Sequence, residues 1–275
     1  MLPDAFFIAS GHGHYQATRA TEGPWDANSM HGGPPAALLA TLATARAIEL
    51  SPSLRLARLS VDFMGGLPLT DLEVTVTVPR PGRRVALVEA TLSADDRSVA
   101  VARAWFINSD SAGKQHPVDL ASPEVAAAEV PALVTPPPLP ASQPQRFFVG
   151  HKGFGYGDAN EWRFTSGGFD QTGPAGVWSR MHIPLIAGEP LTGLGRLLVL
   201  ADAANGISGE LPWGKWVFIP PGMTLTMLRE PVGEWIHLAA RTTLGTDGVG
   251  LCHGQLSDET GPVAIVSQPL LVART

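Results

Sequence analysis

The feature that most constrains the fold of this sequence is a unit that occurs twice, an apolar helical segment followed by four strand-like runs. The first segment, residues 34–50, is rich in alanine and leucine and starts with two prolines, which suit the first turn of a helix. Residues 195–211 form a second apolar segment. A single shift of 164 positions brings the following runs into register across three hairpin turns, with Val61 meeting Leu225. The sequence therefore indicates an internal duplication.

Alternation of apolar and polar residues predicts the strands of both units. The pattern is cleanest in residues 71–80, where every second residue from Leu72 to Val78 is apolar and would share one face. A sheet curled around one apolar helix is the economical way to bury both. We therefore expect an α+β protein with the double hot dog fold, two repeats of an antiparallel sheet wrapped round a buried helix. The expected strands are 56–66, 71–80, 83–94 and 98–108, then 215–230, 234–245, 248–259 and 261–273, with further strands in 14–23 and 176–184.

The stretch between the two units has the composition of a linker. Residues 108–148 contain PPPLP, several serines and alanines, and little periodicity, so we expect them to be extended and on the surface. This places an N-terminal hot-dog domain at residues 1–107 and a C-terminal hot-dog domain at residues 149–275.

Composition and charge argue against several classes of partner. The formal net charge is −6 and basic residues are few and scattered, so we expect no nucleic-acid partner. No run approaches the roughly 20 apolar residues that span a bilayer, and residues 1–10 lack the features of a signal peptide. The single cysteine, Cys252, fits a reducing compartment. We therefore expect a cytoplasmic protein without a membrane partner, and at least a homodimer, because hot dogs commonly pair their sheets.

Four motifs give the chain a resemblance to a known family. They are MHGGPPAALLA at 30–40, VLADAANGIS at 199–208, LREPVGEWIHLAART at 228–242 and GPVAIVSQPLLV at 261–272. In these motifs and in its layout the chain resembles the TesB-like acyl-CoA thioesterases, which are double hot dogs. The resemblance implies hydrolysis of a small-molecule acyl-CoA to a free acid and CoA, without a metal or another cofactor. It also implies that an Asp, a hydroxyl residue and a Gln orient the attacking water, and it assigns the first and last of these catalytic roles to Asp202 and Gln268.

Asp202 and Gln268 are also unusual residues for their surroundings. Asp202 lies in a segment that is apolar on almost every face, where an unpaired carboxylate would cost several kcal/mol, so it needs partners or a cavity. The alternative is a carboxylate that caps nearby backbone or pairs with Arg196 or Arg229. Gln268 interrupts an apolar strand, and its amide can both accept and donate a hydrogen bond, which suits a group that holds water. Its alternative is an outward-facing polar residue.

The hydroxyl position is where the sequence departs from the family. The chain has Ile219-Pro220-Pro221-Gly222 there, and none of these side chains donates a hydrogen bond. Thr224 lies nearby on the same expected strand and could replace the hydroxyl as a substrate-binding residue. The departure leaves open a second function, a hot-dog protein that binds acyl-CoA without catalysis.

The turn HGG at residues 31–33 is the expected oxyanion site. Backbone N–H groups at a helix start are unsatisfied and favour negative charge, and glycines let a carbonyl approach closely. We therefore expect His31, Gly32 and Gly33 to bind the thioester oxygen. The alternative is that Gly-Gly-Pro-Pro only turns the chain into the helix.

A rival function uses the same stretch differently. Asp26 and His31, with Asn28 between them, show the spacing of the MaoC-type enoyl-CoA hydratases, in which an Asp and a His act as an acid–base pair. The hydratase motif usually has Gly before its Asp and an acidic residue two after its His, where this chain has Trp25 and Gly33. Hydration is therefore the alternative function, ranked below thioester hydrolysis.

Overall fold

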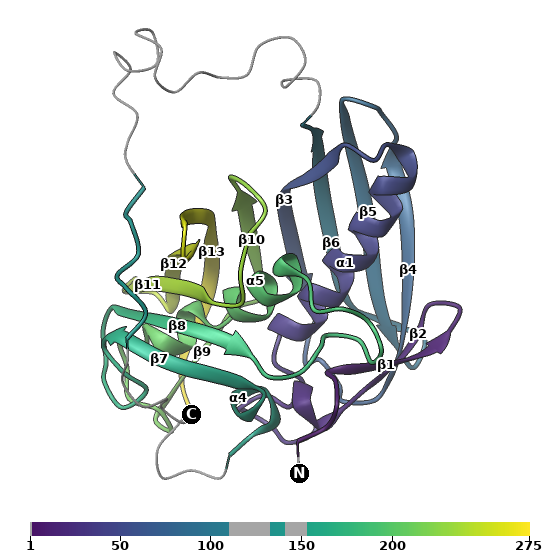
Figure 1. Ribbon diagram of the computed structural model, residues 1–275. Coiled ribbons are helices and arrows are strands. Elements are labelled where there is room, and N and C mark those ends of the chain that lie inside the picture. Colours follow the sequence, from purple (N-terminus) through teal and green to yellow (C-terminus); the bar gives the residue numbers. More distant parts are fainter. Residues whose placement is uncertain (1, 110–132, 141–152) are drawn as a thin grey trace, which may run out of the picture.

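The computed structural model describes residues 2–109, 133–140 and 153–275, and its strands form one antiparallel, strongly curved sheet (Figure 1). The strand order is β1-β2-β4-β5-β6-β3-β10-β13-β12-β11-β8-β7, with β9 paired to β13. The first unit supplies one half of this sheet and the second unit supplies the other. The expected linker, 108–148, lies mostly outside the described residues, and the division into domains stays a prediction.

The first unit wraps its half of the sheet around one helix, α1, as the periodicity predicts (Figure 1). Leu38 and Leu39 of α1 are fully buried, whereas Ile48 in its last turn is 44% exposed, so the helix leaves the core near its end. The elements are β1 (Phe7–Gly11), β2 (His14–Ala17), the 3-10 turn η1 (Arg19–Thr21), α1 (Gly33–Leu50), β3 (Leu54–Phe63), β4 (Asp71–Arg80), β5 (Val85–Ala94) and β6 (Arg97–Asn108).

The second unit has the same plan but is interrupted twice. The expected helix 195–211 is two helices, α5 and α6, separated at Asp202 and Ala203. The expected strand 215–230 is also two, because Pro220 and Pro221 cannot donate to a sheet and the chain leaves it there. The elements are α4 (Gly155–Asp158), β7 (Asn160–Ser166), β8 (Ala175–Met181), α5 (Gly193–Ala201), α6 (Ala204–Ile207), β9 (Trp216–Ile219), β10 (Gly222–Met227), β11 (Ile236–Leu244), β12 (Val249–Asp258) and β13 (Gly261–Arg274).

The two halves of the sheet join where β3 pairs with β10. At the centre of this pairing Ser60 lies opposite Thr224, and their hydroxyl oxygens are 3.3 Å apart. These two residues are separated by 164 positions, the shift that aligns the two units in the sequence. The units are therefore related by an approximate two-fold axis through this pair, which supports the interpretation of a duplication.

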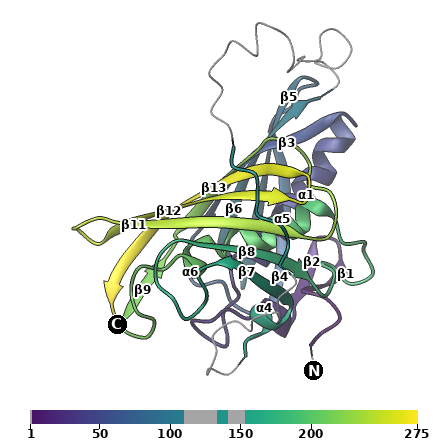
Figure 2. The same cartoon turned by 60° about the vertical axis from the view of Figure 1, so that its left-hand side comes forward.

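The helices of the two units pack against each other inside the curved sheet (Figure 2). Gly33 at the start of α1 lies so close to α5 that a Cβ at this position would be 2.3 Å from the carbonyl oxygen of Val199. A glycine is therefore required by this approach, and it brings the first turn of α1 to the end of α5. Within the described residues no helix is long and apolar enough to cross a membrane.

Candidate active site

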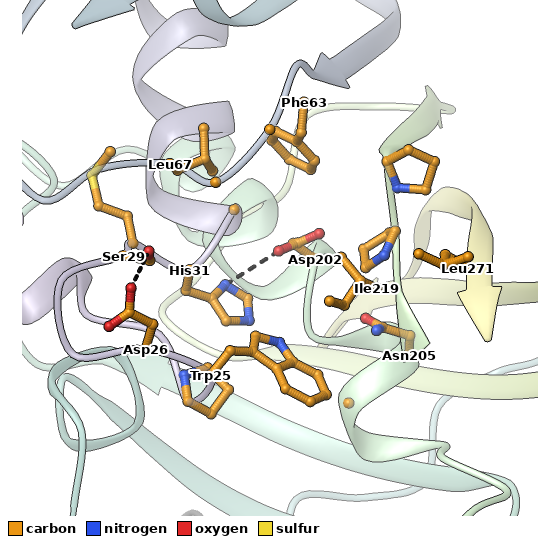
Figure 3. Close-up of a pocket in the computed structure, with 18 of the residues that line it drawn as sticks. Trp25, Asp26, Ser29, His31, Phe63, Leu67, Asp202, Asn205, Ile219 and Leu271 are labelled. Atoms are coloured by element: carbon orange, nitrogen blue, oxygen red, sulfur yellow. Dashed lines mark hydrogen bonds and ion pairs between the residues drawn. The ribbon is translucent and has the colours of Figure 1, made fainter. Parts of the chain in front are cut away.

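A cavity of about 490 Å³ opens where the start of α1 meets the turn between α5 and α6 (Figure 3). The first unit lines it with parts of 24–32 and with residues 63–67. The second unit contributes the α5–α6 turn, Trp213, residues 219–221 and Leu271. Most of this wall is apolar, and among the described residues neither lysine nor arginine lines it. The cavity therefore suits an acyl group better than a phosphate.

Asp202 lies in the α5–α6 turn, lines the cavity and is only 6% exposed. One carboxylate oxygen accepts a hydrogen bond from Gln268 Nε2 at 2.9 Å, and the backbone N–H groups of Gly32 and Gly33 also bond to the carboxylate. Burial raises the pKa of Asp202 to about 7, although these hydrogen bonds favour the charged form. A carboxyl with this pKa can both accept and release a proton near neutrality.

Neither of the two arginines considered as partners of Asp202 reaches it. Arg229 forms a two-pronged ion pair with Asp258, which lowers the pKa of Asp258 against the effect of its burial. Arg196 donates to the backbone carbonyl of Gly233. The carboxylate of Asp202 is thus bonded by neutral donors, which leaves it available as a base.

Gln268 on β13 is fully buried and does not line the cavity. Its Oε1 accepts a hydrogen bond from the backbone N–H of Asn205 at 3.2 Å, so its Nε2 faces Asp202. The structure therefore brings Gln268 and Asp202 together, with the amide donating to the carboxylate from outside the cavity wall.

His31 lies between Asp202 and the aromatic ring of Tyr156. Its Nδ1 accepts a hydrogen bond from the backbone N–H of Gly33 at 3.1 Å and is 3.3 Å from Asp202 Oδ2 (Figure 3). The imidazole stacks face to face on Tyr156, with centroids 3.7 Å apart and planes within 3°. Burial lowers the pKa of His31 to about 3, so the ring is neutral at physiological pH.

The glycine N–H groups of the turn already have acceptors. The N–H of Gly32 bonds to Asp202, and that of Gly33 is shared between Asp202 and His31 Nδ1, so neither is a free donor for a thioester oxygen. A Cβ on Gly32 would be 2.7 Å from Asp202 Oδ2 and 2.7 Å from the Phe63 ring. Glycine at this position therefore permits the close approach of a carboxylate, not of a substrate carbonyl.

The remaining predicted residues lie apart from this cluster. Asp26 is exposed at the rim and bonds the N–H of Asn28 and the hydroxyl of Ser29, whereas His31 lies beside Asp202 (Figure 3). This argues against an acid–base pair of Asp26 and His31, as hydration would need. Thr224 bonds Ser60 at the junction of the units and is not among the residues that line the cavity.

The departure from the family hydroxyl lies directly in the cavity wall. Ile219, Pro220 and Pro221 all line it, so this part of the wall is apolar. The sequence did not identify Tyr156 or Asn205 as parts of the site. Tyr156 belongs to the glycine-rich run GFGYG, which reads as a loop and gives no sign that its tyrosine is buried. The hydroxyl of Tyr156 donates to the carbonyl of Val199 at 2.9 Å. Across the described ranges, no group of three or more His, Cys, Asp or Glu residues could hold a metal ion.

Comparison with known proteins gives the same family for both halves. Residues 21–107 match the model of the acyl-CoA thioesterase N-terminal domain, and residues 130–272 match that of the acyl-CoA thioesterase C-terminal domain. No curated protein matches the chain.

Solved structures share the fold along nearly the whole chain. A conserved protein of unknown function with a hot dog fold from Alicyclobacillus acidocaldarius has 17% identity and a TM-score of 0.71, covering 98% of this chain and 97% of its own. The acyl-CoA thioesterase II TesB2 of Mycobacterium marinum has 14% identity and a TM-score of 0.64, with coverages of 98% and 95%. The tesB protein of Mycobacterium avium subsp. paratuberculosis has 14% identity and a TM-score of 0.65, with coverages of 97% and 96%. At these identities the likeness shows the double hot dog fold.

Proposed function

Because the chain belongs to the acyl-CoA thioesterase family, we propose that it hydrolyses an acyl-CoA thioester to a free acid and CoA, with Asp202 as the general base. The observation that carries the proposal is a buried carboxylate at a largely apolar cavity, bonded by neutral donors and with a pKa raised to about 7. A general base works best when its pKa lies near the working pH.

In the proposed reaction the acyl group occupies the apolar cavity and brings its thioester carbon near Asp202. A water attacks this carbon while Asp202 takes one of its protons. The tetrahedral intermediate then collapses, the carbon–sulfur bond breaks, and the proton passes from Asp202 to the departing thiolate. Gln268 acts as a positioning residue, because its amide is held by Asn205 and in turn fixes one oxygen of Asp202.

The experiment that tests this function compares two Asp→Asn variants at the same cavity. Asp202→Asn removes the base, so we expect kcat for release of CoA, followed with DTNB over a series of acyl chain lengths, to fall by about 10²–10⁴-fold. Asp26→Asn is the matched control, because Asp26 lies at the rim and bonds only local groups, and it should leave turnover unchanged.

The alternatives give different outcomes in the same series. Full turnover by Asp202→Asn would contradict the proposal. If the unaltered protein removes the conjugated absorbance of an enoyl-CoA and Asp26→Asn does not, the result would favour hydration. A thermal shift with CoA or acyl-CoA but no CoA release by the unaltered protein would identify a binding protein without catalysis, as the apolar Ile219–Pro221 wall leaves open. Assembly into at least a homodimer stays a prediction.

A further inference from the structure

Thioester hydrolysis places negative charge on the carbonyl oxygen, and this cavity has few groups to stabilise it. Of the expected donors, the N–H of Gly32 bonds to Asp202 and that of Gly33 is shared between Asp202 and His31 Nδ1. Two polar side chains of the wall also have partners, since Ser29 donates to Asp26 and Asn205 Nδ2 donates to the carbonyl of Phe218. The indole of Trp25 is 43% exposed and stacks on Trp213. None of these groups is a buried donor left free for the oxyanion.

His31 has such a donor. Its Nδ1 accepts a hydrogen bond from the N–H of Gly33, so the proton of the neutral ring is on Nε2. Figure 3 shows this second nitrogen on the side of the ring away from Asp202, and His31 lines the cavity. The Gly33 hydrogen bond favours this tautomer, and the orientation of the ring sets the direction of the N–H.

The orientation of the ring is fixed by its stacking partner. Tyr156 is fully buried, lies parallel to the imidazole, and is itself held by its hydroxyl bond to Val199 on α5. A donor that is already oriented before the substrate binds stabilises a developing charge without reorganisation, which is the main requirement of an oxyanion hole.

We propose that His31, as a neutral imidazole, donates its Nε2–H to the thioester carbonyl oxygen and stabilises the oxyanion of the tetrahedral intermediate. This inference rests on the proposed function and names the donor that its reaction lacks. His31 is then a second catalytic residue, supplied by the first unit, whereas the base Asp202 is supplied by the second.

The contact between His31 and Asp202 couples the two steps of the attack. While Asp202 is ionised, its Oδ2 and the unprotonated Nδ1 are two acceptors 3.3 Å apart, which is unfavourable. When Asp202 takes a proton from the water, its new O–H can replace the N–H of Gly33 as the donor to Nδ1. This bond polarises the ring, so Nε2–H becomes a stronger donor as the oxyanion forms. Asp202 and Tyr156 are the titratable groups facing the ring, and burial raises the pKa of Tyr156 well above its usual value, so it stays neutral.

The test substitutes His31 with Phe and with Gln. His31→Phe keeps a flat ring to stack on Tyr156 but removes the donor, so kcat should fall by about 10²–10³-fold with KM changed by less than about threefold. His31→Gln restores an N–H donor and should recover about tenfold of this loss. The control is His253→Phe, because His253 is exposed on β12 and outside the cavity, and its kcat should equal that of the unaltered protein.

A second measurement does not depend on how the variants fold. Long-range ¹⁵N–¹H NMR of the unaltered protein should show His31 as the neutral Nε2–H tautomer throughout pH 5–8. An Nδ1–H tautomer, an imidazolium in this range, or full kcat in folded His31→Phe would overturn the inference. If Asp202→Asn is inactive while His31→Phe is fully active, only this inference fails. If Asp202→Asn is fully active, the proposed function fails as well.

Discussion

The two units of this chain share a plan, but only the second is interrupted, and its interruptions lie at the cavity. In the first unit α1 and β3 are continuous, whereas in the second the helix breaks at Asp202 and the strand breaks at Pro220. By the shift of 164 that aligns the strands, Gln268 corresponds to Ala104, and the same shift carried into the helices sets Asp202 against Leu38; both counterparts are fully buried apolar residues. The comparison teaches that the carboxylate and its amide partner belong to the unit whose elements are broken, whereas the intact unit supplies His31 and the glycine turn.

The starts of the two main helices make the same point. The first helix of the second unit, α5, is capped by its own residue Thr192, whose hydroxyl accepts from the N–H of Gly195 at 3.0 Å. The N-cap residue of α1 is Gly32, which has no side chain, and the glycine N–H groups at this helix start bond to Asp202 of the other unit and to His31 Nδ1. A helix N-terminus favours an anion. The break in the second unit therefore supplies the carboxylate that the intact helix of the first unit needs.

The largest expected effect comes from copying the carboxylate into the first unit. Leu38→Asp places a charge in the core of α1, where the Gln and glycine partners of Asp202 have no counterparts, and it also removes a large buried side chain. We expect a loss of more than about 4 kcal/mol in the free energy of unfolding, measured by urea titration. Ile48→Asp is the control on the same helix, because Ile48 is 44% exposed, and it should cost about 1 kcal/mol or less. Equal losses in the free energy of unfolding for Leu38→Asp and Ile48→Asp would mean that position 38 tolerates a carboxylate, against the contrast drawn with Asp202.

Removing the amide that fixes Asp202 should have the next largest effect. Gln268→Ala leaves the N–H of Asn205 without its acceptor and lets the carboxylate turn, so kcat should fall by about 10²-fold. The free energy of unfolding should fall by about 1–3 kcal/mol. Gln16→Ala on the exposed face of β2 is the control and should match the unaltered protein in CoA release and urea titration. An unchanged kcat in folded Gln268→Ala would remove the positioning role.

The raised pKa of Asp202 predicts opposite pH trends for activity and stability. The ionised base is needed, so kcat/KM should rise with pH and level off above about pH 7. The folded pKa lies above the unfolded value of about 3.9, so the stabilising contribution is complete below about pH 4 and is lost as pH rises through about 7, at up to about 1.4 kcal/mol per pH unit.

Thermal melting at several pH values checks the stability trend. The melting temperature of the unaltered protein should fall relative to that of Asp202→Asn between pH 5 and 7. Because His31 is buried and neutral, it makes stability rise with pH below about pH 6.5, and it does so in both proteins. The difference between the two melting temperatures therefore reports on Asp202 alone. A constant difference across this range would show that the carboxyl is ionised throughout.

The smallest effect is expected at the junction of the units. Thr224→Val removes a hydroxyl that bonds Ser60 outside the cavity, so stability should change by less than about 1 kcal/mol and CoA release should be unchanged. Thr226→Val, exposed on the same strand, is the matched control for urea titration. A loss of turnover in Thr224→Val alone would restore the original expectation that Thr224 contacts the substrate.

Much of the fold could be predicted because its signals are local. Strand β4 spans the predicted residues 71–80, and the aligned runs of β5 and β12 reflect one shift along the sequence. Strands β1 and β7 were missed, because short segments such as FIASG carry little alternation. The prolines at 220 and 221 were visible, but the alternation around them favoured one continuous strand.

The site could be predicted only in part, because its decisive contacts join the two units. A carboxylate in an apolar segment identified Asp202, but nothing in the sequence shows that its partners are the glycine N–H groups of the other unit. His31 was paired with Asp26 or with a substrate by its neighbours in the sequence, and the fold gives it Asp202 and Tyr156 instead.

The packing of Leu38 and Ala104 at the counterparts of Asp202 and Gln268 has a consequence for how this chain evolves. A symmetric pair of identical subunits would repeat each change in both crevices, so a substitution that improves packing in one would damage chemistry in the other. Fusing the copies separates these demands, because one position can be occupied by a buried apolar side chain while the equivalent position in the other repeat stays polar. In this chain the second repeat supplies Asp202 and Gln268 while the first supplies His31 and the glycine turn, so the two repeats build different parts of one crevice.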